Sequence, residues 1–228
     1  MPIKAVVFDY GNVLNEPPEA TRFQKLARLA GIDEAEFFDR YWRNRLEYDR
    51  SNPLDGTAYW QEVANGAGKE LSTAQIDQLI DLDARLWTDT RPALMEWVRI
   101  LRMRGCEAAV LSNMPREIAA HLRATATWLG LFNLLVFSGE HGLVKPEPGL
   151  YGVCLEGLKA QAAEVLFIDD RQENVAGARN LGMQSVQFES IPQLTLDVEP
   201  YGLRPQIEEA LRYAATRASS GAPAPSAP

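Results

Sequence analysis

The residues best suited to chemistry in this chain are three aspartates that follow runs of apolar residues. Asp9 follows a run at residues 3–8, and the pair Asp169-Asp170 follows a second run at residues 165–168. Short, bounded runs of this kind are typical of strands buried on both faces of a parallel sheet. Because open α/β sheets place their ligand sites at the carboxyl ends of the strands, we expect the three carboxylates to converge there.

Three carboxylates at one sheet edge would repel one another and raise one another's pKa unless a cation lies among them. A set of oxygen ligands with no His or Cys suits Mg²⁺, which also prefers a substrate phosphate as a ligand. We therefore predict a Mg²⁺ cofactor held by Asp9, Asp169, Asp170 and a backbone carbonyl at Gly11.

Two further polar residues are predicted to reach the same edge. Ser112 ends an apolar run at residues 107–111, and Lys145 precedes the helix that leads into the run before Asp169. Ser112, with nearby backbone N–H groups, could donate hydrogen bonds to a tetrahedral oxyanion. Lys145 would balance the negative charge and hold Asp9 ionised.

The elements that must position these residues alternate between strand and helix patterns. Apolar runs predict five strands, at residues 3–8, 107–111, 134–137, 165–168 and 185–188. Helical patterns separate them from residue 91 onward, so we predict an α/β fold with a doubly wound, parallel, five-stranded sheet of Rossmann-like type.

A helical segment interrupts this alternation directly after the first strand. Residues 16–88 carry four apolar stripes at helical spacing and no strand signal, which predicts an insertion of four helices. We therefore divide the chain into a core of residues 1–15 plus 89–217 and an inserted unit of residues 16–88. Residues 218–228 are rich in Ser, Ala and Pro, and we predict a disordered tail.

The overall composition limits the classes of partner. The net charge is −8, which disfavours nucleic acid and anionic membranes as main partners. We see no signal peptide and no apolar run long enough to span a bilayer, so we expect a cytoplasmic protein. The oligomeric state cannot be read from the sequence.

Four motifs, in order along the chain, resemble those of the haloacid dehalogenase (HAD) superfamily of aspartate-nucleophile hydrolases. The resemblance covers the chain to about residue 213, and the helical insertion after the first motif is similar to the subfamily with an α-helical cap. The motifs are Asp9-Tyr10-Gly11-Asn12-Val13, Leu111-Ser112-Asn113, Lys145-Pro146 and Phe167-Ile168-Asp169-Asp170, with Asn174 one turn after the last.

The resemblance implies roles for these residues. Asp9 would be the nucleophile that accepts the phosphoryl group as an aspartyl phosphate, and Ser112 and Lys145 would bind and orient that group. Asp170 would be the main acidic ligand of Mg²⁺ and Asp169 the second. The cap would close over a small phosphorylated substrate and exclude water.

We assign substrate binding to residues of the motifs and of the cap. In the motifs these residues are Gly11, Asn12 and Asn113. In the cap, the stretch 41–50 is rich in aromatic and basic residues, and an arginine there could hold a second anionic group or stack with a sugar ring. We assign Arg43 and Arg45 to this role, and expect at least one of Arg43, Arg45 and Arg50 to face the site.

The sequence departs from the family pattern at Gly11, where the phosphatases usually carry a second Asp that protonates the leaving alcohol. General acid–base assistance is typically worth about 10²–10⁴-fold in rate. We favour a phosphatase that works without this acid, on a substrate with a good leaving group such as an anomeric sugar oxygen. The alternatives are a 2-haloacid dehalogenase, whose halide leaves without a proton, and a non-catalytic binding protein.

Overall fold

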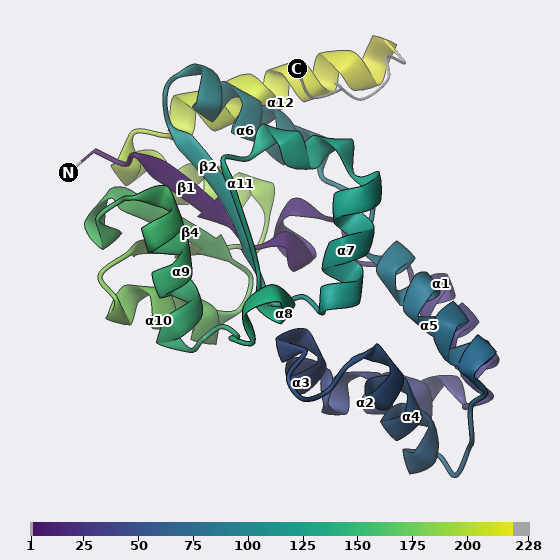
Figure 1. Ribbon diagram of the computed structural model, residues 1–228. Coiled ribbons are helices and arrows are strands. Elements are labelled where there is room, and N and C mark those ends of the chain that lie inside the picture. Colours follow the sequence, from purple (N-terminus) through teal and green to yellow (C-terminus); the bar gives the residue numbers. More distant parts are fainter. Residues whose placement is uncertain (1, 221–228) are drawn as a thin grey trace.

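Five short apolar runs form one parallel sheet, as predicted. The computed structural model describes residues 2–220, and its strands lie in the order β3-β2-β1-β4-β5 (Figure 1). Their bounds are β1 (Ala5–Phe8), β2 (Glu107–Ser112), β3 (Leu134–Phe137), β4 (Val165–Asp169) and β5 (Gln184–Gln187). The strand that carries Asp9 at its end is therefore central, paired with β2 on one side and β4 on the other.

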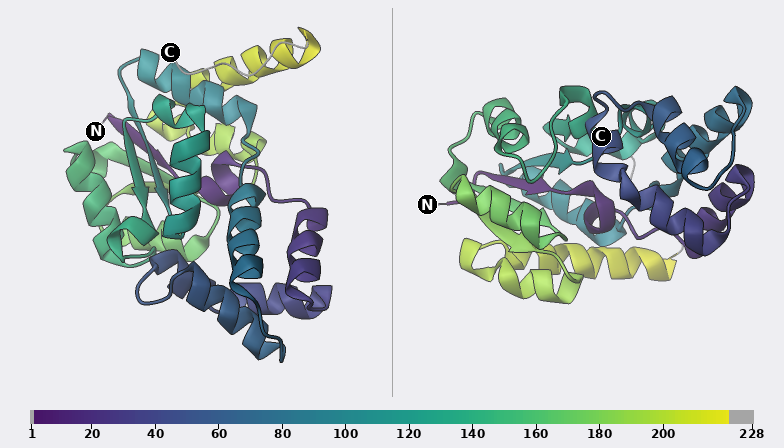
Figure 2. Two further views of the ribbon diagram at one scale, coloured as in Figure 1. Left: turned by 45° about the vertical axis from the view of Figure 1, so that its right-hand side comes forward. Right: turned by 90° about the horizontal axis from the view of Figure 1, so that it is seen from below.

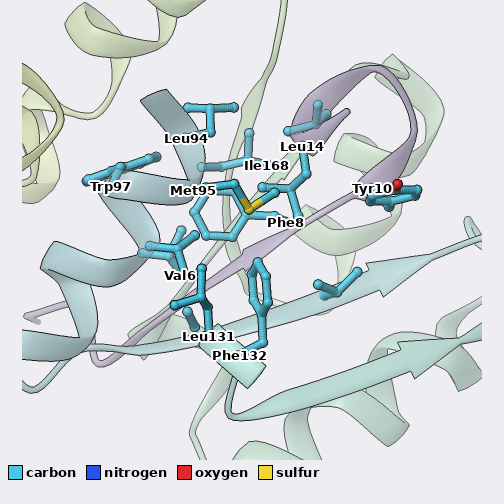
Figure 3. Close-up of a cluster of buried hydrophobic side chains, with 14 of the residues drawn as sticks. Val6, Phe8, Tyr10, Leu14, Leu94, Met95, Trp97, Leu131, Phe132 and Ile168 are labelled. Atoms are coloured by element: carbon cyan, nitrogen blue, oxygen red, sulfur yellow. The ribbon is translucent and has the colours of Figure 1, made fainter. Parts of the chain in front are cut away.

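Helices cover both faces of the sheet, so the doubly wound prediction is confirmed. Successive side chains of a strand point to opposite faces. Val6 and Phe8 pack on one face with α6 (Pro92–Met103), α7 (Arg116–Thr125), α11 (Ile191–Asp197) and α12 (Arg204–Ser220). Phe8 lies edge-on to Trp97, with ring centroids 5.4 Å apart (Figure 3).

The other face of the sheet is covered by two helices, α9 (Pro148–Leu158) and α10 (Gln172–Asn180). Ala5 and Val7 point to this face, where Tyr151 of α9 packs edge-on against Phe167 of β4. Both faces of β1 are thus buried, which explains why its sequence is a continuous apolar run without alternation.

The inserted segment contains five helices, so the prediction of four was wrong. They are α1 (Ala20–Ala30), α2 (Glu34–Arg43), α3 (Arg45–Arg50), α4 (Gly56–Gly66) and α5 (Thr73–Leu86). The apolar stripe over residues 37–46 is divided at Asn44, between α2 and α3. The φ of Asn44, −114°, is not helical, and its side chain donates a hydrogen bond to Glu62. Asn favours such local breaks because its side chain competes with the helix backbone for hydrogen bonds.

These five helices have an apolar core of their own and lie beyond the carboxyl ends of the strands (Figures 1 and 2). Its largest fully buried side chains include Trp60, Tyr41 and Tyr59. We call this group of helices the cap. A capping box formed by Ser72 and Gln75 starts α5.

The two chain crossings between the sheet domain and the cap lie side by side. Asn15 and Thr90 form an antiparallel bridge. Glu16 N–H donates to the Asp89 carbonyl at 2.7 Å, and Arg91 N–H donates to the Leu14 carbonyl at 2.8 Å. The two covalent connections between the cap and the sheet domain thus meet at one isolated antiparallel bridge.

The last described residues of the chain are helical. Residues 218–220 lie at the end of α12, so the predicted disordered tail begins too early; its remainder, 221–228, lies outside the described residues. Among the described helices, none combines the length and the apolar character that crossing a bilayer requires.

Candidate active site

The sheet register brings the three aspartates together. Phe8 of β1 pairs with Ile168 of β4, so Asp9 and Asp169 follow on neighbouring strands at the same level. Asp9, Asp169 and Asp170 each offer a carboxylate oxygen, and these oxygens all lie within 4.8 Å of one another. The predicted convergence of carboxylates at the strand ends is therefore present.

Lys145 lies between two of these carboxylates. It is 1% exposed, and its Nζ is 2.9 Å from Asp9 Oδ1 and 2.6 Å from Asp169 Oδ2. Burial alone lowers the pKa of Lys145, but attraction to Asp169 and Asp9 outweighs it and raises the pKa above its usual value. The lysine is therefore charged, and its charge is shared between two acids.

Asp9 is less strongly ionised than the sequence suggested. Burial raises its pKa to about 7, opposed by Lys145 and reinforced by Asp169 and Asp170. A single ammonium group cannot neutralise three carboxylates, so the site keeps an excess of negative charge. This excess is what a divalent cation would compensate, and the all-oxygen donor set fits Mg²⁺.

The two adjacent aspartates have different surroundings. Asp169 is fully buried and accepts hydrogen bonds from Lys145, from Asn174 Nδ2 at 3.0 Å and from Arg171 N–H at 2.8 Å. Asp170 borders the cavity above the sheet, and its Oδ2 accepts one hydrogen bond from Asn12 Nδ2 at 3.0 Å. Asp169 is therefore held by three neighbours, whereas Asp170 faces the cavity.

The second motif contributes one hydroxyl, of the buried Ser112, and one amide, of Asn113. Ser112 borders the cavity. Asn113 uses both ends of its amide on the backbone of Lys145: Nδ2 donates to the carbonyl at 2.9 Å, and Oδ1 accepts from N–H at 2.8 Å. The Asn113 side chain thus positions Lys145. Only the backbone of Asn113 is left to contact a ligand.

A cavity of about 170 Å³ lies between the strand ends and the cap. Its floor contains Asp9, Gly11, Asn12, Ser112, Asn113, Lys145, Asp170, Arg171 and Asn174. Its walls contain Tyr10, Met114 and Ile118 from the sheet domain and Trp42, Arg45, Asp49 and Trp87 from the cap region. Most predicted site residues therefore border one space.

The predicted cap arginines lie in three different places. Arg45 borders the cavity and is 6% exposed, bonded to Asp49 and Asp83. Arg43 is exposed and borders a separate hollow of the cap, so it is not brought to the site. Arg50 binds Glu147 of the sheet domain through two hydrogen bonds, of 2.9 and 2.7 Å.

The sequence analysis missed three cap-side residues of the cavity. Trp42 and Trp87 border the cavity and pack edge to face, with ring centroids 6.3 Å apart. The sequence assigns no site role to Asp49. The signal available was the stretch 41–50, in which Trp42 and Asp49 stand on either side of Arg45.

One comparison decides the family. Residues 3–182, more than half of the chain, match the hydrolases described as haloacid dehalogenase-like hydrolase. The chain belongs to this family. The four motifs, the sheet order and the helical insertion of this HAD chain all agree with that membership.

The proteins similar to this chain include both phosphatases and dehalogenases. Phosphatase MT3486 of Mycobacterium tuberculosis is 31% identical over 194 residues, which cover 81% of this chain and 87% of that protein. The (S)-2-haloacid dehalogenase of Xanthobacter autotrophicus is 26% identical over 202 residues, covering 85% of this chain and 78% of that protein. The HAD chain is therefore a hydrolase with phosphatase and dehalogenase relatives.

A solved structure shares the fold. A HAD family enzyme of Bacteroides thetaiotaomicron, described as a complex with magnesium and inorganic phosphate, superposes with a TM-score of 0.63. It is 20% identical, and the match covers 82% of this chain and 94% of that one.

The raised pKa of Asp9 predicts how stability depends on pH. The unfolded chain releases this proton near pH 4, whereas the folded, metal-free protein keeps it up to about pH 7. The folded state binds more protons in this window, so Asp9 makes the free energy of unfolding fall as pH rises from about 4 to about 7. Denaturation of the metal-free wild type and of Asp9→Asn at several pH values isolates this contribution; identical slopes in the two proteins would contradict it.

Proposed function

We propose that this HAD chain is a Mg²⁺-dependent phosphatase that acts on a small phosphorylated metabolite through an aspartyl-phosphate intermediate. The observation that carries the proposal is the convergence of Asp9, Asp169 and Asp170 around a single buried lysine. The phosphatase relative and the neighbour with magnesium and phosphate support the same chemistry.

Asp9 is oriented for attack by its own hydrogen bonds. Its Oδ1 accepts from Tyr10 N–H at 2.7 Å and from Lys145, and its Oδ2 accepts none from the described residues. Oδ2 is therefore the oxygen available to attack phosphorus. Bound Mg²⁺ would neutralise charge on the phosphoryl oxygens. Asp9, Asp170, Asp169 and the Gly11 carbonyl are the proposed ligands.

The remaining floor residues are proposed to bind the transferring group. Lys145 and the Ser112 hydroxyl would hold the phosphoryl oxygens, with the backbone N–H groups of Gly11, Asn12 and Asn113 beside them. Arg45 would complete the site from the cap. Arg43, bordering another hollow, is left out of this proposal.

Within the class of phosphate monoesters we favour a sugar phosphate. The cavity walls present the rings of Trp42 and Trp87, which suit the apolar face of a sugar, and Asp49 offers an acceptor for a hydroxyl. An anomeric oxygen is also a relatively good leaving group, which suits a site with Gly11 in the position of the usual acid.

Dehalogenation is the second candidate, favoured by the haloacid dehalogenase relative. Its substrate is itself a carboxylate, and Asp170 and Asp169 beside Asp9 would repel it in the absence of a cation. The acidic cluster therefore favours a metal-bound phosphate over a haloacid.

Removal of divalent cations is expected to abolish hydrolysis of 4-nitrophenyl phosphate and of sugar phosphates, and added Mg²⁺ to restore it. The reason is that the excess negative charge around Asp9 repels a phosphate dianion. Release of halide from 2-chloropropionate, measured in parallel, is expected to be absent. Hydrolysis that persists in chelator, or halide release, would contradict the phosphatase proposal. Mg²⁺ binding without turnover of any phosphate ester would favour a binding protein.

A further inference from the structure

Gly11 has no side chain that could protonate a leaving group, and nothing in the structure requires a glycine there. Its φ of −59° and ψ of 127° are open to any residue. A Cβ added at Gly11 would meet no atom within 4 Å. If this site uses a proton donor, the donor lies elsewhere on the cavity wall.

Asp49 of α3 is a carboxyl group on the opposite wall. It borders the same cavity as Asp9 and is 8% exposed. Its backbone carbonyl accepts a hydrogen bond of 2.5 Å from Ser138 Oγ, and the same Oγ accepts one of 2.7 Å from Met114 N–H. Because Met114 lies two residues after Ser112, this chain of bonds fixes Asp49 relative to the floor.

Asp49 shares its bonded cation with a second acid. Arg45 Nε donates to Asp49 Oδ1 at 2.8 Å, and Arg45 also binds Asp83 at 3.2 Å. Asp83 on α5 is fully buried and accepts a hydrogen bond of 2.7 Å from Tyr41 of α2. Beyond this group, Arg171 of the sheet domain also attracts the Asp49 carboxylate. Two buried carboxylates thus share one bonded guanidinium, which leaves one negative charge in excess.

Asp49 is the member of this pair that can reach a ligand. Its Oδ2 accepts no hydrogen bond within the described part of the chain, whereas both oxygens of Asp83 lie near Arg45. Burial raises the pKa of Asp49, and Arg45 opposes the rise. A carboxyl with these surroundings can hold a proton and also release it.

We propose that Asp49, supplied by the cap, is the general acid and base that replaces the carboxylate absent at Gly11. The inference rests on the proposed phosphatase function. It assigns the proton transfers to a residue on α3 and makes Asp49 a catalytic residue.

Both half-reactions balance with this assignment. Asp9 Oδ2 forms a bond to phosphorus while the ester P–O bond breaks, and the leaving oxygen takes its electron pair together with the proton of Asp49. The Asp49 carboxylate then takes a proton from water, whose oxygen attacks the phosphorus of the aspartyl phosphate. The bond from phosphorus to Asp9 breaks, which releases phosphate, the free Asp9 carboxylate and a protonated Asp49.

The leaving group provides the test. Asp49→Asn keeps the shape and the acceptor for Arg45, which still pairs with Asp83, so the cap is expected to stay folded. With a sugar or alkyl phosphate, whose leaving oxygen needs a proton, kcat is expected to fall about 10²-fold or more. With 2,4-dinitrophenyl phosphate, whose leaving group needs none, the burst of dinitrophenolate release reports formation of the aspartyl phosphate alone, and its rate is expected to fall less than about threefold.

A matched control comes from the same helix. Glu47→Gln changes an exposed acid that pairs with Arg50 at 3.4 Å, and it is expected to leave the rates with both substrates unchanged. The wild-type rate with alkyl phosphate is expected to fall as pH rises past the pKa of Asp49, because the acid must be protonated. This limb should be absent in Asp49→Asn and present in Asp49→Glu.

A rescue variant separates catalysis from binding. Gly11→Asp places a carboxylate in open space beside the nucleophile. Added to Asp49→Asn, it is expected to bring the rate with alkyl phosphate back to at least a tenth of the wild-type rate, because general acid catalysis is worth about 10²–10⁴-fold. Equal losses with both substrates and no rescue would overturn the assignment, as would wild-type rates in Asp49→Asn. If wild type hydrolyses neither ester with Mg²⁺ present, the phosphatase proposal itself fails.

Discussion

Asp9→Asn is expected to lower the hydrolysis of phosphate esters by about 10⁴-fold or more, because an amide cannot replace the attacking carboxylate. The fold should persist, since the amide oxygen can still accept the hydrogen bond from Tyr10 N–H and Lys145 keeps Asp169 as a partner. Steady-state turnover measures the loss. Acid quenching during turnover with labelled substrate should trap phosphorylated protein for the wild type and none for Asp9→Asn.

Asp39→Asn is a suitable control for this experiment, because it makes the same chemical change at an exposed position of the cap. It is expected to retain wild-type turnover and labelling. Full turnover by Asp9→Asn, or equal labelling of both proteins, would show that another residue is the nucleophile.

Lys145→Met is expected to lower the free energy of unfolding by about 3–5 kcal/mol, the usual result when one partner of a buried ion pair is removed. The variant leaves Asp9 and Asp169 facing each other without the ammonium that lies 2.9 and 2.6 Å from them. Chemical denaturation without metal measures the loss. It should shrink as the pH is lowered, because protonation removes the uncompensated charges.

The control is a lysine at the opposite end of the sheet, just before β1. Lys4 pairs with Glu164 at 2.6 Å, but its side chain is 63% exposed. Solvent screens such a pair, so Lys4→Met is expected to cost about 0–1 kcal/mol. Equal destabilisation by the two variants would mean that the buried lysine does not compensate the carboxylates.

The sheet could be predicted because its signal is local and strong. The apolar runs before Asp9, Ser112 and Asp169 are strands buried on both faces, and each ends at a polar residue that the parallel arrangement brings to one edge. The helices of the cap were predicted less well. An apolar stripe continues through the break at Asn44, so periodicity alone joins α2 and α3.

The cap residues of the site were predicted less well than the sheet residues because their positions depend on tertiary folding. Arg43 and Arg45 are two residues apart on opposite sides of the break at Asn44, which decides that only Arg45 borders the cavity. Asp49 escaped notice because a charged residue on a short amphipathic helix is usually solvated. Its burial depends on Arg45, Asp83 and Ser138, which are brought to it only by tertiary folding.

The paired crossings at Asn15 and Thr90 make the cap an exchangeable module. Because the chain leaves and re-enters the sheet domain at one antiparallel bridge, the two ends of the inserted segment lie next to each other whatever the length of chain between them. Asp9, the proposed nucleophile, stays at the end of the central strand, while Trp42, Asp49 and Trp87, which border the cavity, belong to the inserted segment. Substrate preference in this chain can therefore diverge by exchange of one contiguous piece of sequence.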